Sequence, residues 1–294
     1  MICYYLDYKT SNINERDLAQ KGLEYKKNNL ISSNEGVSLI TCHRIEYYLD
    51  TDNKYSHDLF KDFKIESNID LIKERLLKIC IGLESKIIGE KAIQEQVIDS
   101  IKKYSGNLSV LEYKDVLDKA KKIREKFDFS APNHGQLIVE HLVANKTKTL
   151  VIVGAGFLTR SIIETIGYSL KYKNIIVVTR NIKKAEKHIL NIVGGQNVKI
   201  TTIKSFNEEC INEPFDIIIA TDNIDKNYSD NILYLCSKES CVTICDLSSV
   251  PISGADCLSK EYFNLYSQNM NNIIEKQNQM MRDKITSINT VIKN

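Results

Sequence analysis

The fold of this chain is decided by the stretch Thr149-Leu150-Val151-Ile152-Val153-Gly154-Ala155-Gly156, a continuous apolar run that ends in two closely spaced glycines. An apolar run without polar alternation is typical of a parallel strand that helices cover on both faces. Apolar residues at helical spacing follow the glycines directly, at Ile162, Ile163 and Ile166. We therefore predict a strand, a tight glycine turn and a helix, which is how a dinucleotide-binding βαβ unit begins.

The same alternation of apolar runs and helical patterns continues toward the C-terminus. Further apolar segments lie at 174–180, 198–203, 215–221 and 241–247, and 183–193 shows helical spacing. Strands that alternate with helices over short connections predict a doubly wound α/β sheet. We assign residues 131–256 to this Rossmann-like domain. Residues 257–294 are mostly polar, with apolar positions at helical spacing, so we expect one long C-terminal helix there.

Residues 1–130 are expected to form a separate N-terminal substrate domain of α+β type. Residues 1–8 are β-rich, a helical pattern follows, and 37–49 contains one or two strands. Helical spacing returns from Ile69 and again from Glu90. The predicted fold class is therefore α/β: an N-terminal α+β domain, a doubly wound NADP-binding Rossmann-like domain and a C-terminal helix.

Length and composition exclude several classes of protein. At 294 residues the chain is long enough for about two domains. No apolar run reaches the length that spans a bilayer, and no secretory signal opens the chain, so we expect a cytoplasmic protein. The eight cysteines are then expected as thiols, and their spacing lacks the C-x₂-C pairs of zinc sites, so we predict no metal.

The glycine turn predicts a cofactor site. The first glycine makes the tight turn, and the second lets backbone amides reach a pyrophosphate at the helix N-terminus. The third small residue of the G-x-G-x-x-G fingerprint falls at Thr159, so the match is incomplete. The residues predicted to bind the cofactor here are Gly154, Ala155, Gly156, Phe157, Leu158 and Thr159.

The end of the second strand of this domain indicates which cofactor is bound. Thr179-Arg180-Asn181 stands where a carboxylate would bind the ribose 2′-hydroxyl of NAD, and Lys183 follows closely. Cations suit the 2′-phosphate of NADPH, so we predict NADPH held by Arg180, Asn181 and Lys183. The alternative is that Arg180 is merely exposed.

A second candidate site lies at Thr41-Cys42-His43-Arg44-Ile45-Glu46, where an apolar run ends. A thiol at Cys42 can attack a carbonyl carbon, and Arg44 can hold a substrate carboxylate by a bidentate pair. The alternative is a buried structural cysteine beside a surface ion pair.

Two helical regions complete the N-terminal part. Gly82 and Gly89 enclose an apolar segment and predict a bend where backbone approaches a neighbour closely. The helix that follows carries Gln96, which is a pocket residue or part of a solvated face. Residues 112–127 carry six cations on a helical stretch. That stretch is interpreted either as a surface helix rich in ion pairs or as a contact to RNA phosphates.

Taken in order, these segments resemble glutamyl-tRNA reductases over about residues 1–270. Thr41 to Glu46 resembles the family's Thr-Cys-Asn-Arg-Thr-Glu signature. Gly82-Leu83-Glu84-Ser85 through Gly89-Glu90 to Gln96-Val97 resembles its Gly-Leu-Asp-Ser…Gly-Glu-Pro-Gln…Gln-Val segment. Gly154-Ala155-Gly156 is similar to its NADPH loop. Tyr8-Lys9-Thr10 followed by Glu15-Arg16 resembles its N-terminal segment, and Asp246 to Pro251 resembles its Asp-x-x-x-Pro-Arg segment more weakly.

The resemblance implies NADPH-dependent reduction of glutamyl-tRNA to glutamate-1-semialdehyde, a tetrapyrrole precursor. In this reaction the Cys42 thiolate attacks the ester and forms a thioester, tRNA leaves, and hydride from NADPH gives the aldehyde. Arg44 would bind the substrate side-chain carboxylate. A downstream aminomutase is the implied partner. The substrate-binding residues implied are Thr41, His43, Arg44, Ser85, Glu90 and Gln96.

Several positions depart from the family pattern. Arg75 stands where the family has a histidine that is thought to assist catalysis, and His43 and Ile45 replace Asn and Thr of the signature. The C-terminal helix stands where the family's helix leads into a dimerisation domain, so we expect a truncated helix and leave the oligomeric state open. The alternatives are a paralogue acting on another aminoacyl-tRNA in a specialised pathway, a non-catalytic tRNA- or nucleotide-binding regulator, and an ordinary NADP-dependent dehydrogenase.

Overall fold

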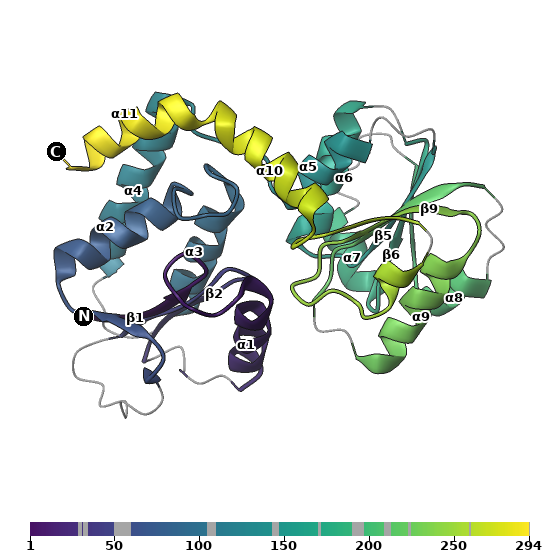
Figure 1. Cartoon of the computed structure of the whole chain (residues 1–294), viewed down its shortest axis with the longest axis horizontal. Coiled ribbons are helices and arrows are strands. Elements are labelled where there is room, and N and C mark those ends of the chain that lie inside the picture. Colours follow the sequence, from purple (N-terminus) through teal and green to yellow (C-terminus); the bar gives the residue numbers. More distant parts are fainter. Residues whose placement is uncertain are drawn as a thin grey trace. The chain divides into compact units, whose positions relative to one another are not determined.

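In the computed structural model the chain divides into two compact units (Figure 1). The first comprises Met1–Pro132 with Ile274–Asn294, and the second comprises Asn133–Ile273. The structure describes residues 1–28, 31, 35–49, 60–104, 110–142, 147–169, 172–189, 197–208, 213–222, 225–258 and 260–293. Within these ranges, no helix is both long and apolar enough to cross a membrane.

An antiparallel sheet lies at the centre of the first unit. Its strands run in the order β2-β3-β1-β4. The strands are β1 (Ile2–Asp7), β2 (Gly36–Ile40), β3 (Arg44–Leu49) and β4 (Lys64–Glu66), and the helices are α1 (Glu15–Asn28), α2 (Ile69–Cys80), α3 (Ala92–Lys103) and α4 (Val110–Phe127). Figure 1 shows α2, α4 and the C-terminal α11 (Arg282–Lys293) together on one side of this sheet.

Strand β3 is buried on both faces, and this places charged residues inside the unit. Ile45, Tyr47 and Leu49 belong to a core shared with Leu18 of α1. Because side chains alternate along a strand, Arg44, Glu46 and Tyr48 point to the opposite face, which α2 covers. Tyr48 belongs to the core formed with α2, α4 and α11. Two charged residues of β3 therefore lie on a helix-covered face.

The second unit contains a six-stranded sheet, all of whose strands are parallel. The strands are β5 (Thr149–Val153), β6 (Asn174–Val178), β7 (Asn197–Thr201), β8 (Phe215–Ile219), β9 (Cys241–Asp246) and β10 (Glu261–Asn264). Their spatial order is β10-β9-β8-β5-β6-β7. Counted from β5, this is the doubly wound order of a Rossmann fold, which confirms the predicted fold class.

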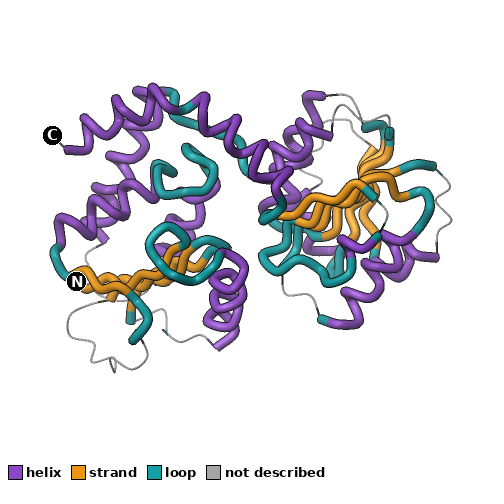
Figure 2. Tube along the Cα trace, viewed as in Figure 1, coloured by secondary structure: helices purple, strands orange, loops and turns teal. Residues whose placement is uncertain are grey.

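Helices cover this sheet on both faces (Figure 2). They are α5 (His134–Leu142), α6 (Phe157–Ser169), α7 (Ile182–Ile189), α8 (Ile203–Glu208) and α9 (Lys226–Ser237), with a 3-10 turn, η2, at Ala255–Cys257. The sheet reverses its strand order between β5 and β8. In such folds, ligands bind in the crevice beyond the carboxyl ends of these two strands.

The expectation of one long helix over 257–294 is wrong in two respects. Residues 261–264 form the edge strand β10, which pairs in parallel with β9. The helical part is divided into α10 (Gln268–Met280) and α11, and the Met281 amide donates to the Asn278 carbonyl at 3.1 Å, a tighter turn than an α-helix makes. Buried Met281 and Ile288 join the core with α2 and α4, so packing fixes this break.

Candidate functional site

Cys42 lies at the tip of the β2–β3 hairpin. The Thr41 amide donates to the Arg44 carbonyl at 2.9 Å, which leaves Cys42 and His43 as a two-residue turn. The Thr41 hydroxyl oxygen accepts from the His43 amide at 3.2 Å. The His43 carbonyl accepts from the Tyr8 amide at 3.1 Å and ties the turn to the end of β1. The hairpin therefore holds a half-buried thiol at a fixed point.

Cys42 differs from most other cysteines of the chain. The buried ones are Cys3, Cys80, Cys236, Cys241 and Cys245, and burial raises the pKa of each thiol. Raised pKa values keep these thiols protonated and inert. Cys257 is exposed. Among the described residues, no three or more His, Cys, Asp or Glu side chains are placed to hold a metal ion.

Arg44 is a buried cation, which rules out the interpretation of its ion pair as a surface pair. It is 2% exposed, its Nη2 donates to the Glu84 carbonyl, and its Nη1 lies 3.6 Å from Glu46 Oε1. Nη1 makes no hydrogen bond with any described residue. A buried donor without an acceptor costs about 1–3 kcal/mol, more for a charged group. The position therefore suits an anionic ligand.

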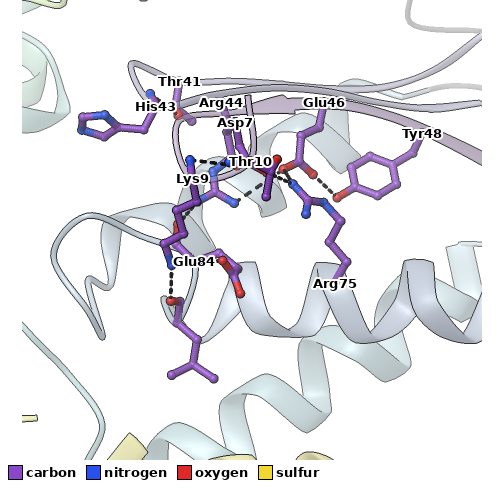
Figure 3. Close-up of polar contacts among 11 residues, drawn as sticks. Asp7, Lys9, Thr10, Thr41, His43, Arg44, Glu46, Tyr48, Arg75 and Glu84 are labelled. Atoms are coloured by element: carbon purple, nitrogen blue, oxygen red, sulfur yellow. Dashed lines mark hydrogen bonds and ion pairs between the residues drawn. The ribbon is translucent and has the colours of Figure 1, made fainter. Parts of the chain in front are cut away.

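Glu46 is fully buried and accepts hydrogen bonds from two side chains (Figure 3). Its Oε2 accepts from the Tyr48 hydroxyl at 2.6 Å, and its Oε1 accepts from Arg75 Nη2 at 2.7 Å. The same Arg75 nitrogen donates to Asp7 Oδ2 at 2.7 Å. Burial raises the pKa of Asp7, but hydrogen bonds from Arg75 and Thr10 more than offset this, so the pKa lies below its ordinary value.

The predicted bend over 82–90 is a loop closed by its own backbone. Gly82 (φ 81°) and Gly89 (φ 86°) both lie in the left-handed region, and the Gly89 amide donates to the Gly82 carbonyl at 3.1 Å. At the end of α2, the Leu83 amide donates to the Lys78 carbonyl at 2.9 Å, as in a Schellman motif. A Cβ on Gly82 would lie 2.9 Å from the Glu90 nitrogen. The close approach predicted from the glycines is confirmed.

Arg124 anchors this loop from α4. Its guanidinium donates to the carbonyls of Cys80 at 2.9 Å, Gly89 at 3.0 Å, Glu90 at 2.8 Å and Phe129 at 2.9 Å. Burial lowers its pKa to about 10. Of the six cations on this helix, Arg124 is buried and the five lysines are exposed. The exposed ones are Lys114, Lys119, Lys121, Lys122 and Lys126.

The other predicted substrate residues occupy different surroundings. Ser85 is 7% exposed and lies in the loop. Burial raises the pKa of Glu90 to about 7, although Arg44 and Arg124 act in the opposite direction. Gln96 is exposed on α3 and makes no side-chain hydrogen bond with a described residue, so the structure does not bring it into this cluster.

His43 packs against an aromatic ring. It is 6% exposed, and its ring packs against Tyr8 with centroids 5.4 Å apart. Figure 3 shows the His43 ring directed away from Glu46 and Arg75. The sequence prediction missed Asp7 and Tyr48 as members of the cluster, although alternation along β1 and β3 is a signal that could have found them.

The glycine turn after β5 fits a dinucleotide phosphate. Gly154 has φ 120°, and a Cβ there would lie 2.5 Å from the Ala220 carbonyl oxygen, next to the end of β8. A Cβ on Gly156 would have no atom within 4 Å, so this position faces open space. Thr159, at the place of the third glycine, is fully buried and its hydroxyl donates to the Gly154 carbonyl at 3.0 Å. Threonine is therefore accommodated within α6.

The remaining predicted cofactor residues lie around the same strand ends. Ala155 and Leu158 are half-buried, and Phe157 is 46% exposed. At the end of β6, Arg180 and Lys183 are exposed, and the Arg180 guanidinium lies 5.2 Å from the centre of the Tyr228 ring.

Asn181 caps helix α7, because its Oδ1 accepts from the Lys184 amide at 3.0 Å. Asp246, part of the weaker resemblance at 246–251, likewise organises its own loop. Its carboxylate accepts from the amides of Ser248 at 3.1 Å and Ile252 at 2.7 Å. Both side chains therefore have local structural partners.

Comparison with known proteins gives two adjacent family matches. Residues 6–126 match the glutamyl-tRNAGlu reductase N-terminal domain, and residues 135–248 match shikimate / quinate 5-dehydrogenase. Protein nfe2 of Rhizobium meliloti is 27% identical over 309 residues, covering 100% of this chain and 97% of that protein.

The similar reductases are longer than this chain. The glutamyl-tRNA reductase of Picrophilus torridus is 32% identical over 201 residues, covering 64% of this chain and 48% of that protein. That of Methanocaldococcus jannaschii is 28% identical over 69% of this chain and 54% of its own length. The chain thus spans about half the length of these reductases.

Among solved structures, the glutamyl-tRNA reductase from Methanopyrus kandleri aligns with a TM-score of 0.46 at 15% identity, over 99% of this chain and 77% of that one. The two family matches lie in the order that the sequence motifs predicted, and the fold of the second unit is that of NAD(P)-binding dehydrogenases. The chain is therefore similar to a divergent glutamyl-tRNA reductase, with a first domain that matches the N-terminal domain of that family and a second domain that matches a dehydrogenase.

Proposed function

We propose that this protein reduces glutamyl-tRNA to glutamate-1-semialdehyde with NADPH, by way of a thioester on Cys42. Two observations in the same hairpin support this most strongly. The half-buried thiol of Cys42 lies at the hairpin tip, and Arg44 follows it two residues later. The buried Nη1 of Arg44 makes no hydrogen bond with any described residue. A nucleophile beside a carboxylate-binding cation is what an acidic aminoacyl ester requires.

The first step is acyl transfer to the thiol. Cys42 Sγ, as thiolate, attacks the ester carbonyl carbon, a C–S bond forms, and the ester C–O bond breaks so that the tRNA hydroxyl leaves. Arg44 holds the side-chain carboxylate of the glutamyl group. The 82–90 loop supports Arg44 through the Glu84 carbonyl. Ser85 and Glu90 of the same loop are the further substrate-binding residues of this proposal. Fixed geometry of this kind lowers the entropic cost of the reaction.

The second unit would hold the reductant. Gly154 permits the tight turn against the Ala220 backbone, and Gly156 leaves room for the pyrophosphate at the start of α6. Arg180 and Lys183 supply cations at the end of β6. No carboxylate follows β6 at this point, which favours NADPH over NADH. When bound, NADPH supplies the hydride that reduces an acyl group to the aldehyde.

A second candidate is a paralogue that transfers or reduces another aminoacyl group. It is favoured by the match to Protein nfe2, which covers 97% of that protein, whereas the reductases are matched over about half their length. Arg75 in place of the histidine expected from the family resemblance points the same way. A protein that binds NADPH tightly and leaves aminoacyl-tRNA intact would instead be a regulator.

A single-turnover assay with glutamyl-tRNA tests the proposal. Wild type and Cys42→Ser are compared with and without NADPH, and Cys257→Ser serves as a control at another cysteine that is not buried. We expect semialdehyde only from proteins that keep Cys42, and only with NADPH. Aldehyde formation by Cys42→Ser would refute the thioester route. Cys42-dependent release of an aminoacyl group other than glutamate would establish the paralogue.

A further inference from the structure

Arg75 donates hydrogen bonds to two carboxylates, Glu46 and Asp7, that share a sheet face with Arg44. Arg75 projects from α2 onto the face of the sheet that carries Arg44 and Glu46, and its guanidinium carbon lies 3.8 Å from the centre of the Tyr5 ring. In the pairing of β1 with β3, Tyr5 lies opposite Glu46 and Asp7 lies opposite Arg44. Arg75 is thus fixed by two carboxylates and one aromatic ring.

The distances show that the two arginines do not share Glu46 equally. Glu46 Oε1 lies 2.7 Å from Arg75 Nη2 and 3.6 Å from Arg44 Nη1. The first distance is that of a charge-assisted hydrogen bond and the second is too long for one. The other oxygen of Glu46 is engaged by Tyr48 at 2.6 Å. Arg75 therefore takes the acceptor that lies nearest to Arg44.

The same holds for Asp7, the residue directly opposite Arg44 in the sheet. Its Oδ2 accepts from Arg75 at 2.7 Å, and its Oδ1 accepts from the Thr10 amide at 2.8 Å and hydroxyl at 2.9 Å. Both carboxylates that share this face of the sheet with Arg44, Glu46 on its own strand and Asp7 opposite it, thus accept hydrogen bonds from other residues. Together with Arg44 and Arg75 they form a cluster of two positive and two negative side chains.

We propose that Arg75 is a positioning residue that engages Glu46 and Asp7 so that buried Arg44 keeps a hydrogen-bond donor for the carboxylate of a ligand. This inference rests on the proposed function, because it takes Arg44 as the carboxylate-binding residue. Without Arg75, the freed Glu46 oxygen closes on Arg44 Nη1 and competes with the ligand. Arg75 thereby sets affinity for an acidic acyl group without touching it.

The test is a rescue experiment on single-turnover deacylation of glutamyl-tRNA. Arg75→Gln is expected to raise the half-saturating glutamyl-tRNA concentration by roughly 10- to 100-fold, because the ligand loses one charge-assisted hydrogen bond. The limiting rate is expected to change less. The double variant Arg75→Gln/Glu46→Gln removes the competing carboxylate and leaves the net charge of the cluster unchanged. It is expected to recover most of the lost affinity.

Two further variants make the test specific. Lys78→Gln removes a cation from the same helix, one that pairs with Glu74 at 2.5 Å, and is expected to behave as wild type. Arg75→Lys retains one charge and replaces Arg75→Gln if thermal unfolding shows that Arg75→Gln is not folded. Unchanged affinity in the Arg75 variant, or no recovery when Glu46→Gln is added to it, would overturn the inference.

If the wild-type protein is inactive on glutamyl-tRNA, the proposed function is refuted. The positioning role of Arg75 can then still be tested separately. In that case the probe is glutarate, and the readout is protection of Cys42 from iodoacetamide. Protection in wild type, its loss in Arg75→Gln and its return in the double variant would support the positioning role. No protection of the wild type by glutarate would overturn that role as well.

Discussion

The Gly89 amide donates a hydrogen bond to the Gly82 carbonyl at 3.1 Å, and this contact closes the loop whose Glu84 carbonyl holds Arg44. Arg124 bonds the same loop from outside, and Asn278 of α10 accepts from the Ile88 amide at 2.8 Å and donates to the Lys86 carbonyl at 2.9 Å. Arg44 is therefore held by the backbone of the 82–90 loop. The position of that loop depends on Gly82, Gly89 and the buried Arg124.

Gly82→Ala is expected to destabilise the protein by about 1–3 kcal/mol, because it adds strain at a positive φ and a Cβ 2.9 Å from backbone nitrogen. Chemical denaturation measures the change. Gly156→Ala is the control, since a Cβ there meets nothing within 4 Å and its effect should stay within about 0.5 kcal/mol. Equal losses in the two variants would contradict this account of the loop.

Arg124→Met is expected to cost about 3 kcal/mol or more, because it leaves the carbonyls of Cys80, Gly89 and Glu90 buried without their donor. Lys121→Met changes an exposed cation of the same helix, paired with Glu125 at 3.9 Å, and should be nearly neutral. Thermal and denaturant unfolding distinguish the two. A neutral Arg124→Met would show that the carbonyls find other donors.

Glu90 should make stability depend on pH. Burial raises its pKa to about 7, whereas the ordinary value is 4.5. Between these values the folded protein keeps a proton that the unfolded chain has released, so the free energy of unfolding falls as pH rises and levels off above about 7. Glu90→Gln removes this loss and should be more stable than wild type at pH 8 by up to about 3 kcal/mol.

The comparison uses denaturation curves of wild type and Glu90→Gln from pH 4 to 8. The difference between the two proteins isolates Glu90, because Asp7 and the other acids titrate in both. The two stabilities should diverge through pH 4.5–7 and run parallel above it. A constant difference over the whole range would show that Glu90 has an ordinary pKa.

Arg180→Gln is expected to weaken NADPH binding roughly 10-fold or more and to leave NADH binding nearly unchanged, because only NADPH carries the 2′-phosphate. Fluorescence titration with each nucleotide measures both affinities. Lys173→Gln, an exposed cation elsewhere in the second unit, is the control. A parallel loss for the two nucleotides would place Arg180 outside the 2′-phosphate site.

Much of the second unit could be predicted because strands such as β5 and β6 are apolar runs, and the predicted bounds of β5 are the observed ones. Strand β10 could not, since Glu261 to Asn264 have no apolar run and depend on the ladder with β9. Arg124 lies on the apolar stripe of α4 with Ala120 and Ile123, a signal that the count of charges obscured.

The charged cluster was less accessible from the sequence. The sequence indicates Cys42, Arg44 and Glu46 together because they lie close to one another in the chain. The bond of Arg75 to Asp7 joins residues 68 positions apart, and no periodicity predicts such a pair. In the sequence Arg75 is only a departure from the family motif, and its position beside Glu46 follows from the fold.

The most direct test of the central claim is intact-protein mass spectrometry after mixing with glutamyl-tRNA in the absence of NADPH. We expect an adduct with the mass of one glutamyl group, removed by hydroxylamine and mapped to the peptide that contains Cys42. Cys42→Ser should show no adduct, and Cys257→Ser should show the full adduct. An adduct that persists in Cys42→Ser, or a folded wild type that forms none, would contradict a Cys42 thioester.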